Sequence, residues 1–116
     1  MQYILLIYGD ESGREATDPE QGRTMMAEYR EFTQALIDEG KMRAGDALEP
    51  TSSATTVRVR NGETMLTDGP FAETREQLGG YYLIEAASLD EAVDAARRIP
   101  GARSGSIEVR PVMVFD

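Results

Sequence analysis

The sequence predicts an α+β domain in which two helices cover one face of an antiparallel sheet. Three observations lead to this prediction: an uninterrupted apolar segment at residues 3–8, two segments with apolar residues at helical spacing, and an Asn-Gly pair between two alternating segments. In chain order, the predicted elements are strand, helix, strand, hairpin, strand, helix and strand. This order is typical of a ferredoxin-like sandwich with an inserted β-hairpin. A length of 116 residues fits one domain over residues 1–116.

The first unit is a strand followed by a long helix. Residues 3–8 are apolar throughout and rich in Ile and Tyr, which is typical of a strand buried on both faces. Thr17 and Glu20 have the spacing of a capping box, and Gly40 supplies a left-handed C-cap, so a helix is expected over about 18–39. Its apolar stripe consists of Met25, Tyr29, Phe32 and Leu36.

The middle of the chain is predicted to form a hairpin. Alternating segments on both sides flank Asn61-Gly62, a pair that accepts the two positive φ values of a type I′ turn. Gly69 is expected to be extended because Pro70 follows it, and together they end the hairpin. Residues 73–78 are then expected to make one or two helical turns.

The second unit repeats the strand-helix-strand order. Residues 81–86 are predicted to be a strand, Ser88 and Glu91 form a second capping box, and Pro100 stops the helix that follows. Residues 106–110 begin the last strand. The apolar stripe of this helix is expected to be Leu89, Ala92, Val93, Ala96 and Ile99.

One face of the predicted sheet has no helix to cover it. The strand at residues 3–8 is apolar on both faces, and the later strand presents Tyr81 and Leu83 opposite Tyr82 and Ile84. Since a large apolar face is rarely left in water, we expect a homodimer in which two sheets meet face to face. The alternative is that the hairpin or the C-terminal segment of the same chain folds over this face.

Composition excludes several classes of protein. The chain has 12 Lys+Arg against 21 Asp+Glu, a net charge of −9, and it contains no histidine and no cysteine. These counts exclude disulfides, thiolate zinc sites, a cysteine nucleophile and an imidazole base. Negative charge without a basic run argues against binding nucleic acid. We expect a cytoplasmic protein with no membrane span, no bound metal and no cofactor.

Residues 67–86 carry a distinctive pattern that begins with Asp-Gly-Pro-Phe at residues 68–71 and ends in a Tyr-Tyr-Leu-Ile strand. Here the sequence resembles the YCII-related domain family, in its DGPF subgroup. The resemblance implies a ferredoxin-like fold assembled as a dimeric α+β barrel, in agreement with the dimer expected from the apolar faces. It extends to residues 3–8, 54–58 and 106–111.

The resemblance also bears on activity. Some members of the wider family are proposed to use a His-Asp pair in a cleft, and this chain has no histidine to supply it. A helix-to-helix correspondence places Tyr29 near that position, and a phenol, with a pKa of about 10, is a poor base at neutral pH. Relatives in the DGPF subgroup are often encoded beside extracytoplasmic-function sigma factors, which implies a sigma-factor-type partner as a further expectation.

Polar and aromatic residues of the predicted cleft are candidates for a binding site. Asp68 is the best candidate for a catalytic group, although an Asp before Gly-Pro more often has the structural role of accepting backbone N–H bonds or capping a turn. Arg75 either clamps an anionic ligand or joins an ion-pair network. Glu85, a charge within an apolar strand, is expected to pair with Arg58 or Arg110. The full candidate set is Tyr29, Arg58, Asp68, Arg75 and Tyr81.

Three functions remain open at this point. The first is a small-molecule-binding or accessory regulatory dimer, which the absence of histidine favours over an enzyme. The second is an enzyme with lyase-like or proton-transfer chemistry on a small substrate, with Asp68 as acid or base. The third is an acidic interaction module for a sigma-factor-type partner.

Overall fold

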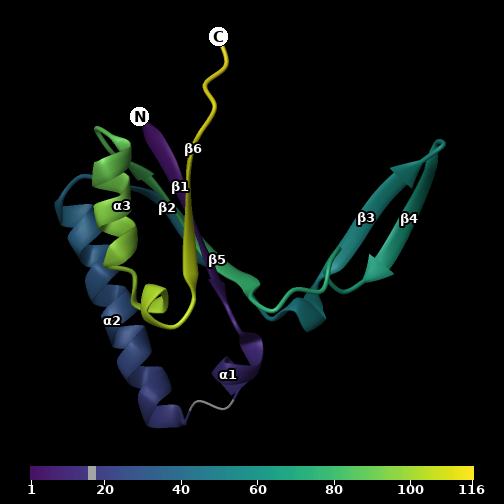
Figure 1. The fold of residues 1–116 in the computed structure, drawn as a ribbon, viewed down its shortest axis with the longest axis horizontal. Coiled ribbons are helices and arrows are strands. Elements are labelled where there is room, and N and C mark those ends of the chain that lie inside the picture. Colours follow the sequence, from purple (N-terminus) through teal and green to yellow (C-terminus); the bar gives the residue numbers. More distant parts are fainter. Residues whose placement is uncertain (16–17) are drawn as a thin grey trace.

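The computed structural model describes residues 1–15 and 18–116, and it has an α+β architecture with antiparallel sheets (Figure 1). The strands and α-helices are β1 (Gln2–Gly9), α1 (Glu11–Glu15), α2 (Pro19–Asp38), β2 (Met42–Ala47), β3 (Thr55–Arg60), β4 (Glu63–Asp68), β5 (Gln77–Glu85), α3 (Leu89–Arg97) and β6 (Ser106–Pro111). Short 3-10 turns lie at Thr51–Ser53 and Pro100–Arg103. None of the helices in the described residues is both long and apolar enough to cross a bilayer.

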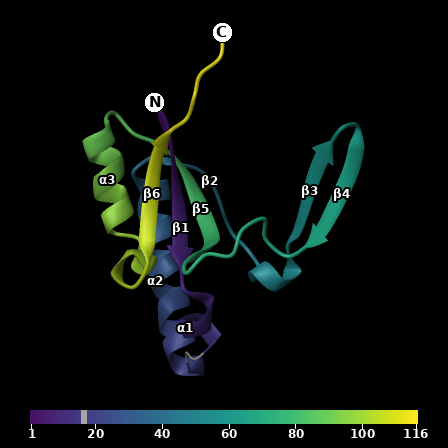
Figure 2. The same cartoon turned by 45° about the vertical axis from the view of Figure 1, so that its right-hand side comes forward.

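Four strands form the main sheet in the order β2-β5-β1-β6, and every neighbouring pair is antiparallel. Helices α2 and α3 lie together on one face of this sheet (Figures 1 and 2). The predicted α+β class is confirmed, and the strand order is compatible with a ferredoxin-like fold. Strands β3 and β4 form a separate two-stranded sheet, which stands away from the main one (Figure 2).

The hydrophobic core fills the space between the helices and the sheet. Leu5 of β1, Ile84 of β5 and Leu36 of α2 have no exposed surface, and the rings of Phe32 and Tyr82 meet edge to face at 5.1 Å. The remaining buried apolar residues come from β1, from α3 and from the segments that follow β5 and α3: Tyr3, Ala86, Ala92, Ala95, Ala96 and Ile99.

Helix α2 follows its predicted bounds closely. Its N-cap is Asp18, whose side chain accepts a hydrogen bond of 2.9 Å from the Gln21 amide, whereas Thr17, the predicted cap, lies outside the described residues. At the other end Gly40 has a φ of +73°. This confirms the predicted left-handed position, which glycine adopts without a steric penalty.

The predicted apolar stripe of α3 is partly wrong. Leu89 is 52% exposed and Val93 39% exposed, whereas Ala95, which the prediction left out, is buried. The buried positions of α3 and its C-terminal extension are therefore 92, 95, 96 and 99, which still have helical spacing. Small alanines on this stripe let the helix lie close to the sheet, so the larger side chains turn outward.

The hairpin has the predicted turn. Asn61 and Gly62 have φ values of +52° and +78°, as a type I′ turn requires. The prediction that Gly69 is extended is wrong, because its φ is +99°. This conformation, open to glycine, lets the Gly69 amide donate a 2.7 Å hydrogen bond to the Ala54 carbonyl and close the base of the hairpin.

The helical turns predicted at residues 73–78 are absent. Gln77 and its successor already belong to β5, and an irregular turn precedes them. The Thr74 hydroxyl donates to the Glu76 carbonyl at 2.6 Å, and the Gln77 amide group donates to the Thr74 carbonyl. These side-chain bonds to the backbone replace the bonds of a helix that is too short to be stable alone.

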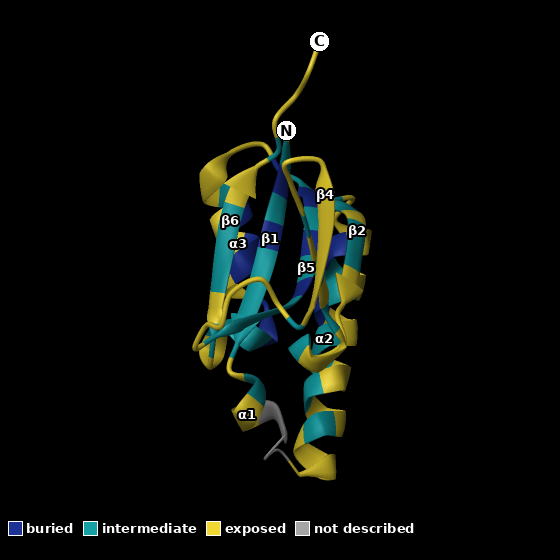
Figure 3. Cartoon of the chain, turned by 90° about the vertical axis from the view of Figure 1, so that its right-hand side faces the viewer, coloured by how far each residue is buried: buried dark blue, intermediate teal, exposed yellow. Residues whose placement is uncertain are grey.

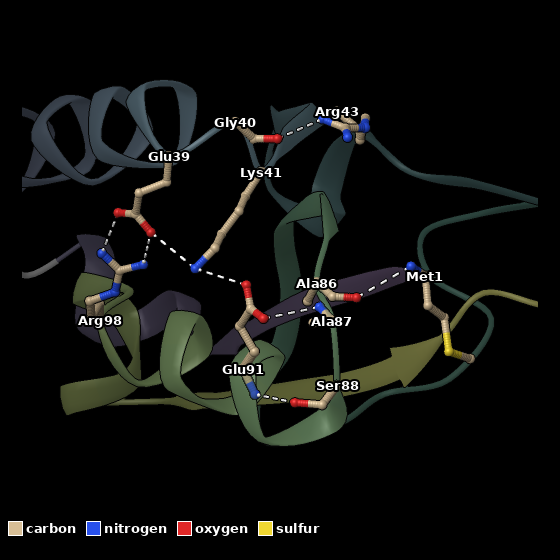
Figure 4. A network of polar contacts seen from close by, with 10 residues as sticks. All are labelled: Met1, Glu39, Gly40, Lys41, Arg43, Ala86, Ala87, Ser88, Glu91 and Arg98. Atoms are coloured by element: carbon tan, nitrogen blue, oxygen red, sulfur yellow. Dashed lines mark hydrogen bonds and ion pairs between the residues drawn. The ribbon is translucent and has the colours of Figure 1, made fainter.

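An ion-pair network joins α2, β2 and α3 (Figure 4). Lys41, the only lysine of the chain, lies 3.1 Å from Glu39 and 3.1 Å from Glu91. The Arg98 guanidinium donates two hydrogen bonds of 3.1 Å to Glu39, one to each carboxylate oxygen. Hydrogen bonds from Arg98 and Lys41 lower the pKa of Glu39, and those to Glu91 and Glu39 raise the pKa of Lys41.

Lys41→Met is expected to lower the free energy of unfolding by about 1 kcal/mol at pH 7, since two partly exposed ion pairs are lost. The pKa of Glu39 is lowered in the folded state. The stabilisation that comes from the Glu39 carboxylate is therefore complete above its ordinary pKa and is lost as the pH falls through its pKa in the folded protein. The difference between wild type and variant therefore shrinks below about pH 4.5. Urea titrations at several pH values measure it, and Arg97→Met, at a fully surface pair, serves as the control. A difference that is constant from pH 7 to pH 3 contradicts the assignment.

Candidate functional site

The face of the main sheet opposite the helices carries two rows of side chains, which we call the open face. Strand register places the first row across Ala44, Leu83, Ile4 and Arg110, and the second row across Asp46, Tyr81, Leu6 and Glu108. Figure 3 views this face, and no helix lies in front of it. The apolar side chains of the rows are partly exposed, whereas Tyr3 and Leu5 of β1 and Tyr82 and Ile84 of β5, which alternate with them, are buried under the helices.

The apolar part of the open face is flanked by a polar pair on each side. On the β2 side, the Tyr81 hydroxyl donates a 2.7 Å hydrogen bond to Oδ2 of Asp46. On the β6 side, Glu108 and Arg110 form an ion pair. Between them lie the central residues of β1 and β5, with Leu6 opposite Tyr81. This arrangement can hold a flat apolar group and offer hydrogen bonds and charge at its edges.

The hydrogen-bond donors of the two pairs, Tyr81 and Arg110, both have raised pKa values. The hydrogen bond to the Asp46 carboxylate raises the pKa of Tyr81 above its ordinary value. The Glu108 carboxylate likewise raises the pKa of Arg110. At neutral pH Tyr81 is therefore a hydrogen-bond donor and not a base. The open face is suited to binding by hydrogen bonds and charge more than to proton abstraction.

Tyr81 and Tyr29, two of the predicted site residues, lie on different sides of the sheet. The Tyr29 hydroxyl, on α2, accepts a 3.1 Å hydrogen bond from the Gly101 amide on the helix-covered side. Tyr82, the neighbour of Tyr81, also lies on that side, where its hydroxyl is 2.8 Å from Oγ1 of Thr33. Within one chain, the sheet separates Tyr29 from Tyr81.

The other predicted site residues lie on the hairpin and the segment after it. Arg58 donates to the Phe71 carbonyl at 3.3 Å, and Asp68 is paired with Thr55 at the exposed base of the hairpin. Strand alternation places Arg58 and Asp68 on opposite faces of the hairpin. Arg75 is exposed. One chain does not bring the five residues together.

A cavity of about 300 Å³ lies beside the turn at the base of the hairpin. The cavity borders this turn and the start of β5. Thr51, on one wall, is fixed by Glu11, whose carboxylate accepts 2.8 Å hydrogen bonds from the Thr51 amide and hydroxyl. Its lining residues are Thr51, Pro70, Ala72, Glu73, Thr74 and Gln77. The described residues contain no group of three or more acidic side chains placed to hold a metal ion.

Sequence reasoning missed three of the four polar residues on the open face. Asp46, Glu108 and Arg110 are not in the predicted site, because their importance depends on which strands lie next to β5 and β1. The period-two alternation of their strands was the available signal. Glu85 was predicted to pair with Arg58 or Arg110, and this is wrong: it pairs with the amino group of Met1, the residue before Gln2, which is the register partner of Glu85 on the neighbouring strand.

Comparison with known proteins gives one relative and one family. An uncharacterised protein of Rhizobium meliloti (strain 1021) is 44% identical over 117 residues, an alignment that spans 99% of this chain and 94% of the relative. The profile of a family described as "YCII-related domain" matches residues 1–116, which is the whole length given. The chain belongs to the YCII-related domain family.

Proposed function

We propose that this protein binds a small molecule on the open face and acts as a homodimer in which two open faces meet. One observation carries the proposal: an apolar strip, flanked by the Tyr81–Asp46 pair and the Glu108–Arg110 pair, lies on a sheet face with no helix over it. Two such faces packed together give a site with apolar walls and polar edges, which is the usual composition of a small-molecule pocket.

The arrangement favours binding over catalysis. Tyr81 stays protonated because of Asp46, and the chain has no histidine to act as a base near neutral pH. Asp68, the predicted acid or base, is on the exposed hairpin and not in either row of the open face. The ligand class supported by these groups is a small molecule with a flat apolar body and polar atoms at its rim: a hydrogen-bond donor for the oxygens of Tyr81 and Asp46, or an acceptor for Arg110.

Tyr81→Phe is expected to weaken ligand binding about five-fold, the effect of removing one neutral hydrogen bond. Thermal-shift titrations with benzoate and phenol, followed by a wider panel of small aromatic compounds, measure the change. The matched control is Tyr82→Phe, the same substitution one residue along the strand and on the other side of the sheet. It should alter stability and leave the dissociation constant unchanged. Equal loss of binding in the two variants, or no binding of any panel compound to wild type, contradicts the proposed site.

A further inference from the structure

The hairpin of β3 and β4, residues 55–68, projects from the main sheet and is called the arm. It forms a sheet of its own and stands on the side of the open face (Figures 1 and 3). The radius of gyration of the chain is 16.2 Å, whereas a compact domain of this length has a value of about 13 Å. The projecting arm and the C-terminal segment after β6, which runs away from the sheet (Figure 1), both contribute to this extended shape.

One side of the arm is apolar and exposed. Register pairs Val57 with Leu66, so these two side chains and Val59 share one side. Val57 and Val59 are each 59% exposed, Leu66 is 68% exposed, and Phe71, which follows the arm, is 78% exposed. A two-stranded hairpin is at best marginally stable alone in water. Packing against another surface would supply the missing stabilisation.

The apolar surface of the arm is large enough to contribute to a dimer. With roughly 150–200 Å² for a fully exposed side chain of this size, Val57, Val59 and Leu66 present roughly 300 Å² per chain. Two symmetry-related arms would bury about 600 Å² from this source alone, about half of the roughly 1,200 Å² at the lower limit for a specific interface. The two open faces add further area to the same assembly.

Charge also favours a second copy of this chain as the partner. The arm has two basic residues, Arg58 and Arg60, and two acidic residues, Glu63 and Asp68, and is therefore neutral. The rest of the chain has 10 basic and 19 acidic residues, and so carries the whole net charge of −9. An arm without net charge can approach another strongly acidic chain without adding to their repulsion.

We propose that the arm of each copy packs its Val57–Val59–Leu66 side against the other copy, so that two arms are exchanged around a two-fold axis. This inference rests on the dimer of the proposed function and adds that each copy contributes its arm to the other. Because the arm stands on the side where the second sheet would lie, each arm borders the shared binding site of the two open faces. Asp68, on the same side of the arm as Leu66, then lies at the boundary between the copies.

Photo-crosslinking from the arm tests this exchange. The chain has no cysteine, so Leu66→Cys can be labelled at one position with a thiol-reactive benzophenone. The matched control is Met65→Cys, the adjacent residue on the opposite side of the arm, which is 50% exposed in the single chain. In a mixture of ¹⁴N- and ¹⁵N-labelled protein, mass spectrometry distinguishes crosslinks between chains from those within a chain.

Leu66→Cys is expected to give at least five-fold more crosslinks between chains than Met65→Cys. Crosslinks confined to one chain, or equal yields from the two positions, would overturn the arm exchange. Light scattering on the same samples separates the two proposals. A dimer whose arm crosslinks stay within one chain overturns the exchange and leaves the face-to-face dimer standing. The mass of a single chain overturns both the exchange and the dimer. The ligand site is tested separately by the Tyr81→Phe titration.

Discussion

Replacing Ile84 by alanine is expected to lower the free energy of unfolding by about 3–4 kcal/mol. Ile84 has no exposed surface and belongs to the core cluster with Leu5 and Leu36, between β5 and the helices. The substitution removes apolar atoms from a close-packed site and leaves a cavity that its neighbours fill only in part. This loss is a large fraction of the total stability of a domain, which is typically about 5–15 kcal/mol.

Urea unfolding followed by circular dichroism measures this loss. Val93→Ala on α3 is the control, because Val93 is 39% exposed and its truncation leaves no closed cavity. It should cost about 1 kcal/mol or less. Similar losses in the free energy of unfolding for the two variants would show that Ile84 of β5 is not packed under the helices.

Leu6→Asp is expected to convert the proposed dimer into single chains. Leu6 is central in the second row of the open face, between Tyr81 and Glu108 in register. In a face-to-face dimer the new carboxylate would be buried without a cationic partner, which costs several kcal/mol. The dissociation constant should then weaken by more than about 100-fold. Sedimentation velocity at micromolar concentration should show the mass falling from about twice 12.8 kDa to 12.8 kDa.

Leu89→Asp provides the comparison for this variant. Leu89 is on α3, on the other side of the sheet, and is 52% exposed, so a carboxylate there stays in water. That variant should keep the mass of wild type. If Leu6→Asp remains a dimer, or if both variants dissociate alike, the open face is not the surface on which two copies meet.

Elements determined by local chemistry were predicted well from the sequence. The α2 bounds follow from an N-terminal cap, an apolar stripe and a C-terminal glycine, all within 23 residues of one another. The hairpin turn follows from two residues, Asn61 and Gly62, whose backbone preferences agree with the turn type. The errors at Gly69 and α3 have the opposite origin, since a long-range hydrogen bond and the close approach of a helix to the sheet outweighed the local pattern.

The candidate site depends on contacts that are distant in the sequence, and this limited its prediction. Tyr81 reaches Asp46, 35 residues earlier, only because β2 is the neighbour of β5 in the sheet. The prediction places Tyr29 and Tyr81 in one pocket between helix and sheet, yet strand alternation and the position of α2 put the sheet between them. The pairing of Glu85 with the Met1 amino group likewise spans 84 residues. No local pattern contains that information.

The central claim is that two copies meet through their open faces, and isotope-filtered NOE measurements on a mixture of labelled and unlabelled protein test it most directly. The methyl groups of Ile4, Leu6 and Leu83 lie side by side on that face. NOEs between chains are expected at these methyl groups. None is expected at Ile84, which lies under the helices with no exposed surface. NOEs between chains that are confined to the outer surfaces of α2 and α3, or their complete absence at millimolar concentration, would contradict it.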